Sequence, residues 1–271
     1  MSKREFVPIE QIQKYAKLPM DRIQFTLGKL NKLGLIYQTR GAYSGHKLNF
    51  AGYDSLAINT LVKAGVIESF GQILGVGKEA DVYDALSPDE KRIAVKFHRL
   101  GRISFRQTRR KRAYAREHSS WLFQSHLAAE KEFQAMQLVY KKGVSVPEPL
   151  SHNRHVIAMG MIEGAELSKY SEIAKPEKIL KEILRNVRKT YLKAHVIHAD
   201  LSEYNIILQP DGHILIIDWP QYIMTDHANA EEILERDLKN IITFFNRKFS
   251  VKVLAEEACA YVTGKARNLI I

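Results

Sequence analysis

The 271-residue chain has a single cysteine, Cys259, so it cannot form an internal disulfide bond. No Cys and His cluster has the spacing of a zinc site, and no segment approaches the roughly 20 consecutive apolar residues that cross a bilayer. The first ten residues, MSKREFVPIE, lack the apolar segment of a signal peptide. These absences exclude a disulfide-stabilised secreted domain, and they predict a soluble cytoplasmic protein that makes no contact with membranes.

Acidic residues are scarce relative to basic ones, but only in two parts of the chain. The formal net charge of +11 arises from an excess of +5 in residues 1–70 and +8 in residues 99–116, whereas the remainder is slightly acidic. Positive charge that is concentrated in this way favours contact with a polyanion such as nucleic acid. The apolar content of 45% is enough for the core of one large domain or two smaller ones.

Helical and hairpin patterns alternate in the first 70 residues. Apolar residues recur at helical spacing after Pro19, and Gly34 ends this run. Two short extended segments surround a glycine-rich turn at residues 41–45, and a helix follows up to Gly65. This order resembles a winged-helix domain, and the alternative is a generic helical cap that packs on its neighbour. A winged helix usually contacts nucleic acid through its second helix and its wing, which here carry Arg22, Lys29, Lys32, Arg40 and Lys47.

From residue 67 the pattern changes to short apolar strands. FGQILGVG, EADVYDAL and RIAVKFHRL predict three successive antiparallel strands of a small sheet. Residues 120–142 lack Gly and Pro and predict a helix, and VSVPEPL and HVIAMGMIEG predict two more strands. Further helices are expected over residues 176–195, 231–247 and 251–262.

The stretch GVGKEADVY, residues 75–83, predicts a glycine-rich turn between two strands. Gly75 and Gly77 lack the Cβ atoms that would keep a phosphate group away from the backbone amides. Lys96 lies in the next strand, 21 residues after Gly75, at a spacing that suits a lysine binding the α- and β-phosphates of a nucleotide. Each feature by itself also fits a simple hairpin and a lysine that points to solvent.

A helical glutamate should hold such a lysine in place. Glu132 shares a helix face with Ala128 and Met136, whereas Glu130 shares one with polar side chains. We therefore expect an ion pair between Lys96 and Glu132.

Four polar residues cluster between two apolar runs in HADLSEYNIILQPDGHILIIDWPQ. His198, Asp200 and Asn205 follow the spacing H-x-D-x-x-x-x-N, and Asp218 comes 13 residues after Asn205, past a Pro-Asp-Gly turn. A hairpin would place Asn205 and Asp218 at neighbouring strand ends, where their oxygens can hold Mg²⁺. Asp200 would accept a proton from, or orient, the attacking group. Each residue alone has a bland interpretation, but the order and spacing of the whole set favour a phosphoryl-transfer site.

Residues 99–116, RLGRISFRQTRRKRAYAR, contain eight Arg or Lys and no acidic residue, with Phe105 and Tyr114 among them. Repulsion between like charges predicts a flexible loop over residues 99–118 that orders on a polyanion. Arg together with aromatic residues suits RNA, through phosphate pairing and base stacking. Neutralising about eight phosphates of duplex-like RNA would give a slope of log affinity against log salt of roughly −7. The alternative is a solvated loop that only maintains solubility.

The motifs GVGKEADVY, AVKFHRLGRISFR, IHADLSEYNIIL and IIDWPQ resemble those of the RIO atypical protein kinases, in the subfamily with an N-terminal winged helix. The resemblance implies an α+β fold with a winged-helix domain at residues 1–70 and a two-lobed kinase-like domain, its N-lobe at 71–162 and its C-lobe at 163–271. It implies an atypical serine/threonine kinase or ATPase that uses ATP and Mg²⁺, or Mn²⁺. It also implies a nucleotide-dependent switch in maturation of the small ribosomal subunit, with the subunit precursor and its rRNA as partners.

The resemblance also implies roles for single residues. Lys96 would bind phosphates, Asp200 would be the catalytic aspartate, and Asn205 and Asp218 would bind the metal. Asp218 would also form the phospho-aspartate intermediate found in some members. The expected nucleotide-binding set is Gly75, Val76, Gly77, Lys78, Val82, Lys96, Glu132, Met161 and Ile162.

Several positions depart from related patterns. Ala80 stands where the RIO family usually has Ser, and Ala199 where ordinary protein kinases have Arg. Asp218 is followed by Trp-Pro and not by Phe-Gly, and the 53 residues after it leave little room for a peptide-docking platform. Two alternatives remain open. One is a small-molecule kinase of the aminoglycoside or choline type, and the other is a nucleic-acid-binding regulator whose kinase-like domain only senses nucleotide.

Overall fold

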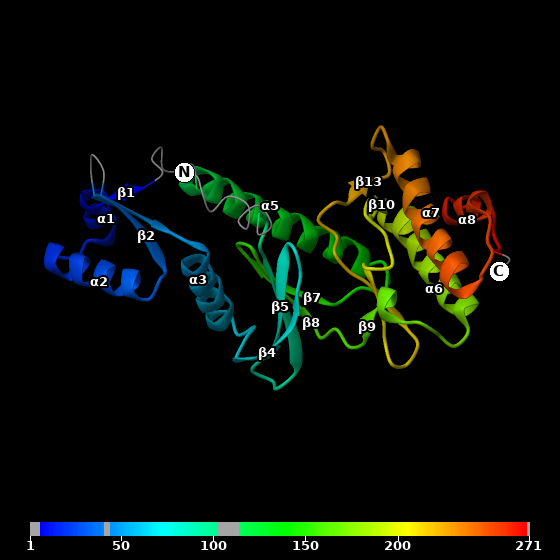
Figure 1. The fold of residues 1–271 in the computed structure, drawn as a ribbon, viewed down its shortest axis with the longest axis horizontal. Coiled ribbons are helices and arrows are strands. Elements are labelled where there is room, and N and C mark those ends of the chain that lie inside the picture. The colour runs from blue at the N-terminus through cyan, green and yellow to red at the C-terminus, as the bar shows by residue number, and fades with distance from the viewer. Residues whose placement is uncertain (1–5, 41–43, 102–113, 270–271) are drawn as a thin grey trace.

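The computed structural model describes residues 6–40, 44–101 and 114–269. Figure 1 shows the N-terminal helices α1 and α2 at one end of an elongated molecule and the C-terminal helices at the other. The N-terminal elements are β1 (Val7–Pro8), α1 (Ile9–Ala16), α2 (Met20–Lys32), β2 (Ile36–Arg40), β3 (Ser44–Leu48) and α3 (Phe50–Lys63). Strand β3 pairs antiparallel with both β1 and β2, and this order of helices and hairpin agrees with the predicted winged helix.

Local sequence signals explain where these helices begin and end. Pro19 precedes the first residue of α2, and Gly34 follows the helix with a positive φ of 67°, a conformation that glycine adopts without steric penalty. Helix α3 begins after Asn49, whose side chain accepts a hydrogen bond from the Gly52 amide at 3.0 Å. Gly52 itself is buried where α3 passes the backbone of Leu35 so closely that a Cβ atom would overlap the Leu35 carbonyl oxygen.

A five-stranded antiparallel sheet follows, with the strand order β4-β5-β6-β8-β7. Its strands are β4 (Ser69–Val76), β5 (Ala80–Leu86), β6 (Arg92–His98), β7 (Pro149–Asn153) and β8 (Val156–Gly160), and the helix α5 (Tyr114–Tyr140) contacts β6, β7 and β8. The first three strands confirm the predicted meander. The centre of the sheet is dry, because Ala94, Val95 and Ile157 are completely buried.

Helix α3 is part of the core of this sheet as well as of the winged helix. Ala57 and Leu61 of α3, and Ile67 just after it, are almost completely buried. They join one apolar cluster with side chains of the sheet, namely Ala85, Ile93, Val95, Phe97 and Val156. The N-terminal domain therefore packs against the sheet through a shared apolar cluster, in addition to being covalently linked to it.

The C-terminal part is mainly helical. Its longer helices are α6 (Pro176–Lys189), extended by a π-helical turn (Thr190–Ala194), α7 (Ala230–Phe249) and α8 (Ala255–Val262). Its short strands are β9 (Ala165–Glu166), β10 (Val196–Ile197), β11 (Ile206–Leu208), β12 (Ile214–Ile216) and β13 (Ile223–Met224), with a 3-10 turn at Leu167–Lys169. The β11–β12 hairpin confirms the predicted pairing across the Pro-Asp-Gly turn, with Ile206 opposite Ile216.

Three predicted boundaries were wrong. We expected a flexible loop over residues 99–118 and a helix from residue 120, but helix α5 already begins at Tyr114. The helix can begin earlier because the dense run of Arg residues ends at 112 and Arg116 is followed by the acidic Glu117. Residues 144–148 are not a strand, and Pro147 supplies no N–H for a ladder. Residues 251–254 precede α8 in non-helical conformation, after Ser250 ends α7 with a positive φ of 58°.

Most of the basic stretch, residues 102–113, lies outside the described residues, so its predicted flexibility stays a prediction. Within the residues that the structure does describe, none of the helices combines the length and the apolar character needed to span a bilayer.

We predict that Gly52→Ala destabilises the winged helix by about 1–3 kcal/mol, because the added methyl group must displace the Leu35 backbone or α3. The matched control is Gly28→Ala in α2, where a Cβ meets nothing within 4 Å and the higher helix propensity of Ala should stabilise by up to about 1 kcal/mol. Thermal unfolding followed by circular dichroism would measure both variants. An unchanged midpoint for Gly52→Ala would contradict the close packing of α3.

Candidate active site

A cleft of about 850 Å³ is lined by the glycine-rich turn, strands β5 and β6, helix α5, the segments that follow β8 and β12 and the segment that precedes β11. Ten of the twelve predicted site residues line it, namely Gly75, Val76, Gly77, Lys78, Val82, Lys96, Glu132, Ile162, Asn205 and Asp218. Met161 and Asp200 lie outside this lining, and Asp200 is exposed to solvent. The structure therefore brings together residues that are up to 143 positions apart in the sequence.

Lys96 is the centre of the site. Its ammonium nitrogen donates to both carboxylate oxygens of Glu132 and to Oδ1 of Asp218, each at 2.8 Å. A lysine has three N–H donors, so these contacts use all of them. The predicted pairing of Lys96 with Glu132 is present, and Glu130 is exposed on another face of α5.

Each charge of this buried ion pair shifts the pKa of its partner. Burial alone would raise the pKa of Glu132, but the charge of Lys96 and the ring of His98 outweigh it and lower that pKa to about 2. Burial likewise opposes the charge on Lys96, yet Asp218 and Glu132 raise its pKa well above the ordinary value. His98, itself 3% exposed, has Nε2 2.9 Å from Glu132 Oε2. Lys96 and Glu132 are therefore both charged at neutral pH.

Asn205 and Asp218 meet because they flank the same hairpin. The Ile217 amide donates to the Asn205 carbonyl oxygen at 2.9 Å, which places the residues before β11 and after β12 side by side. The Asn205 side-chain nitrogen donates to the Asp200 carbonyl oxygen at 2.7 Å, so its amide oxygen is the atom that can coordinate a cation. Asp218 has a φ of 67°, a strained conformation for a non-glycine residue that often marks functional positions.

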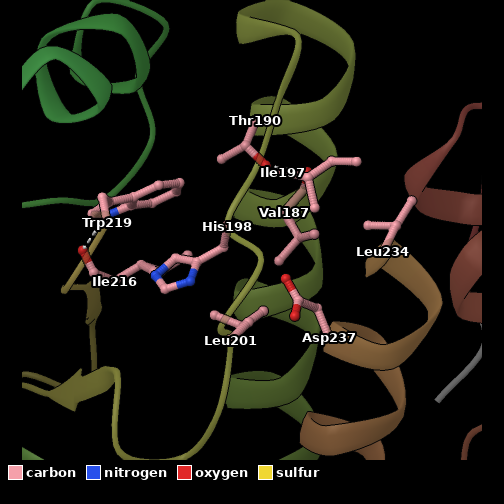
Figure 2. A pocket seen from close by; sticks show the side chains of 9 residues that line it. All are labelled: Val187, Thr190, Ile197, His198, Leu201, Ile216, Trp219, Leu234 and Asp237. Carbon is pink, nitrogen blue, oxygen red and sulfur yellow. Dashed lines mark hydrogen bonds between the residues drawn. The ribbon is translucent and has the colours of Figure 1, made fainter. Parts of the chain in front are cut away.

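A residue of α7 forms a hydrogen bond with the segment that carries Asp200. Figure 2 shows His198 between Trp219 and Asp237, around a cavity of about 10 Å³. Asp237, only 1% exposed, accepts a hydrogen bond from the Ala199 amide at 2.8 Å, and burial raises its pKa. His198 Nε2 lies 3.0 Å from the Ile217 carbonyl oxygen, and burial lowers its pKa, so the neutral ring donates this bond.

Sequence reasoning missed several of these residues. Asp237 has no motif around it and lies 37 positions after Asp200, so only the fold brings it beneath the loop. Trp219 was noted only as a departure from other kinases, yet it is 1% exposed, donates from Nε1 to the Ile216 carbonyl oxygen at 3.1 Å and packs on His198 with ring centroids 4.5 Å apart. Its position directly after Asp218 was the available signal.

Comparison with known proteins adds to this geometry. Residues 81–258 match the RIO domain family, which is more than half of the chain, and residues 1–64 match the family described as Rio2, N-terminal. The chain belongs to the RIO kinase family. A RIO domain behind a Rio2-type N-terminal domain confirms the predicted α+β fold, with a winged helix before a kinase-like domain.

Named relatives agree with this assignment. The RIO-type serine/threonine-protein kinase Rio2 of Methanocaldococcus jannaschii is 39% identical, over 97% of this chain and 100% of its own length. The serine/threonine-protein kinase rio2 of Dictyostelium discoideum is 36% identical over 92% of this chain, which spans only 48% of that protein. The Rio2 kinase of Chaetomium thermophilum, solved as an ADP/Mg²⁺-phosphoaspartate complex, superposes with a TM-score of 0.80 at 32% identity, over 97% of this chain and 82% of that one. The predicted enzyme class, an atypical serine/threonine-protein kinase, is thereby confirmed.

The depressed pKa of Glu132 predicts a pH dependence of stability. A carboxyl group whose pKa falls from 4.5 to about 2 on folding stabilises the fold above pH 4.5 and loses this contribution as the pH falls toward 2. Glu132→Gln should therefore flatten the dependence of the unfolding free energy on pH between these values. Urea unfolding at stepped pH would measure the slope.

The matched control is Glu130→Gln, two residues away on the exposed face of α5, which should retain the slope of the parent protein. Equal slopes for the two variants would contradict the coupling of Glu132 to Lys96.

Proposed function

We propose that this protein binds ATP and Mg²⁺ in the cleft and acts as an ATP-dependent kinase or ATPase, a nucleotide-dependent switch in maturation of the small ribosomal subunit. The observation that carries the enzymatic part is Lys96, which is bonded at once to Glu132 and to Asp218 beneath the glycine-rich turn. This is the arrangement that aligns a nucleotide in protein kinases.

The glycine-rich turn fits the phosphate end of a nucleotide. Gly75, Val76, Gly77 and Lys78 are exposed and line the cleft, and a Cβ on Gly75 would meet nothing within 4 Å, so the backbone there is open to a ligand. The Gly77 amide donates to the Ala80 carbonyl oxygen at 2.8 Å, which closes the turn and rigidifies it. Val82 and Met159 supply apolar surface deeper in the cleft for a base.

A phosphate can enter the Lys96 network by exchange. Because all three donors of Lys96 are used, a phosphate oxygen would take the place of one acceptor, and Asp218 is the more exposed of the two, with 42% of its side chain accessible against 2% for Glu132. Glu132 would keep the lysine oriented, while Asp218 turns toward the metal. Mg²⁺ bound by Asp218 and Asn205 would neutralise charge on the transferred phosphoryl group.

Asp218 is also the proposed first acceptor. One of its carboxylate oxygens forms a bond to the γ-phosphorus, the bond from that phosphorus to the β–γ bridging oxygen breaks, and ADP leaves. Water then hydrolyses the acyl phosphate, or the group passes to a hydroxyl. The exposed Asp200 would orient the second nucleophile and take its proton. Support comes from the Chaetomium thermophilum relative, which was solved as a phosphoaspartate complex.

The ribosomal role is supported by surfaces suited to RNA. Arg22, Lys29 and Lys32 are exposed on α2, and Phe25 on the same helix is 66% exposed with the Lys29 ammonium 5.1 Å from its ring centroid. An exposed aromatic ring among cations can stack on an unpaired base. Lys47 is half-buried, and its ammonium lies 5.9 Å from the Phe6 ring centroid.

We predict that single-turnover incubation with γ-labelled ATP and Mg²⁺ produces hydroxylamine-sensitive label on the protein and then free phosphate. Asp218→Asn should abolish this label, and Asp200→Asn should slow its loss by about 10²–10⁴-fold, because proton transfer and orientation are removed. The control Asp226→Asn changes an exposed aspartate after β13 and should behave as the parent. Stable label on Ser or Thr, with none on Asp218, would make the protein a direct hydroxyl kinase and contradict the aspartate route.

The RNA prediction follows from charge. Arg99 is already paired inside the fold, which leaves at most seven Arg or Lys of residues 99–116 for phosphate contacts. Binding to a duplex RNA should show a slope of log affinity against log salt of about −6, and replacing Arg109, Arg110 and Arg112 by Gln should reduce its magnitude by about 3. Fluorescence anisotropy at stepped salt would measure both. A slope near zero would remove the basic stretch as an RNA contact.

A further inference from the structure

Asp54, in the N-terminal helix α3, is bonded to two residues of the kinase-like part. Its carboxylate accepts a forked pair of hydrogen bonds from the Arg99 guanidinium, at 2.7 and 2.8 Å, and lies 2.7 Å from His155 Nε2. His155 is completely buried and burial lowers its pKa, so the neutral ring donates this third bond. Burial would raise the pKa of Asp54, but His155 and Arg99 together lower it.

Aromatic rings enclose this ion pair. The Arg99 guanidinium lies 5.4 Å from the ring centroid of Phe50 and 5.3 Å from that of Phe97, and Phe50 packs edge-on against His155. The Arg99 side chain is 15% exposed and that of Asp54 20%. A partly dry, forked Arg and carboxylate pair has a defined geometry that a single-point contact lacks.

Arg99 also connects to the glycine-rich turn. Its amide donates to the Glu79 carbonyl oxygen at 2.5 Å, and its Nε lies 3.4 Å from Asp81 Oδ2. Glu79 lines the cleft one residue after Lys78. The side chain of Arg99 is therefore held by α3 while its backbone holds the end of the turn.

The residue after Arg99 extends the connection to α5. The Leu100 amide donates a hydrogen bond to Ser125 Oγ at 3.1 Å, and Leu100 lines the cleft. Ser125 is completely buried on α5, the helix that carries Glu132. Arg99 and Leu100 thus connect three parts of the molecule: helix α3, the glycine-rich turn and helix α5, which carries Glu132.

We propose that Asp54 is a positioning residue for nucleotide binding: through Arg99 it holds residues 75–80 in the conformation that receives the phosphates. The N-terminal domain then contributes to the affinity of the cleft through Arg99, although none of its described residues lines the cleft. This inference rests on the proposed nucleotide binding, and it adds a residue from outside the kinase-like part to that function.

The test is a comparison of nucleotide affinity and turnover. Asp54→Asn should raise the KM for ATP and the Kd for ADP with Mg²⁺ by about 5- to 10-fold, a typical coupling between distant sites, while kcat at saturating ATP changes less than 2-fold. Hydrogen exchange of residues 75–80 should accelerate in the variant, whereas exchange in α6 and α7 should not. A merely structural role would lower the folded fraction and kcat without this split.

Arg99→Lys provides an independent variant, because it keeps the charge but loses the forked geometry. It should reproduce the effect, and the double variant should be no worse than either single one, since both act through the same contact. If Asp54→Asn fails to fold, Arg99→Lys alone carries the test.

The matched control is Asp84→Asn, which breaks the 2.8 Å ion pair with Arg92 in the same β5–β6 hairpin at the end away from the turn. It should leave Kd and KM unchanged. Additive effects of Asp54→Asn and Arg99→Lys, or parent affinity in both, would overturn the proposal. Absence of nucleotide binding in the parent protein would instead refute the proposed function, so the two failures are distinguishable.

Discussion

The structure depends on one buried ammonium group. Lys96 is 9% exposed, and an uncompensated charge at that depth would be strongly destabilising, so both carboxylates are needed to keep it inside. Glu132 comes from α5 and Asp218 from the segment after β12, so the ion pairs tie the five-stranded sheet to the C-terminal part of the chain. The same requirement draws the glycine-rich turn, the proposed metal ligand Asn205 and the strained Asp218 around one cleft.

The second constraint is the way the N-terminal domain is attached. Helix α3 places Ala57 and Leu61 in the core of the sheet and Asp54 against Arg99, so it belongs to both parts of the molecule. Gly52 allows this because it lets the helix approach the Leu35 backbone on its other side. A winged helix that packs on the sheet in this way can pass a change in its position on to the cleft, whereas one joined by a flexible linker could not. The proposed RNA-contacting surface on α2 and the proposed nucleotide cleft are consequently parts of one connected structure.

Predictions from the sequence were accurate where a residue pattern has a direct local cause. The meander β4-β5-β6, the β11–β12 hairpin and α2 followed from alternating or helical apolar spacing bounded by Gly, Pro or Asp-Gly turns. Glu132 was distinguished from Glu130 because apolar neighbours on its helix face indicate burial. Boundaries failed at Tyr114, Pro149 and Ala255, where helix or strand formation depends on packing and on available N–H groups as much as on periodicity.

The sequence by itself determined which type of chemistry could be predicted, because the order and spacing of Lys96, Asp200, Asn205 and Asp218 are properties of the chain. Only the tertiary structure decided what holds these groups. Asp237 beneath the Asp200 loop, Trp219 against His198 and Asp54 on Arg99 are contacts between segments 20 or more residues apart, and local periodicity does not identify these partners. Local periodicity reports which face of an element is apolar, but the partner of a buried charge is chosen by three-dimensional packing.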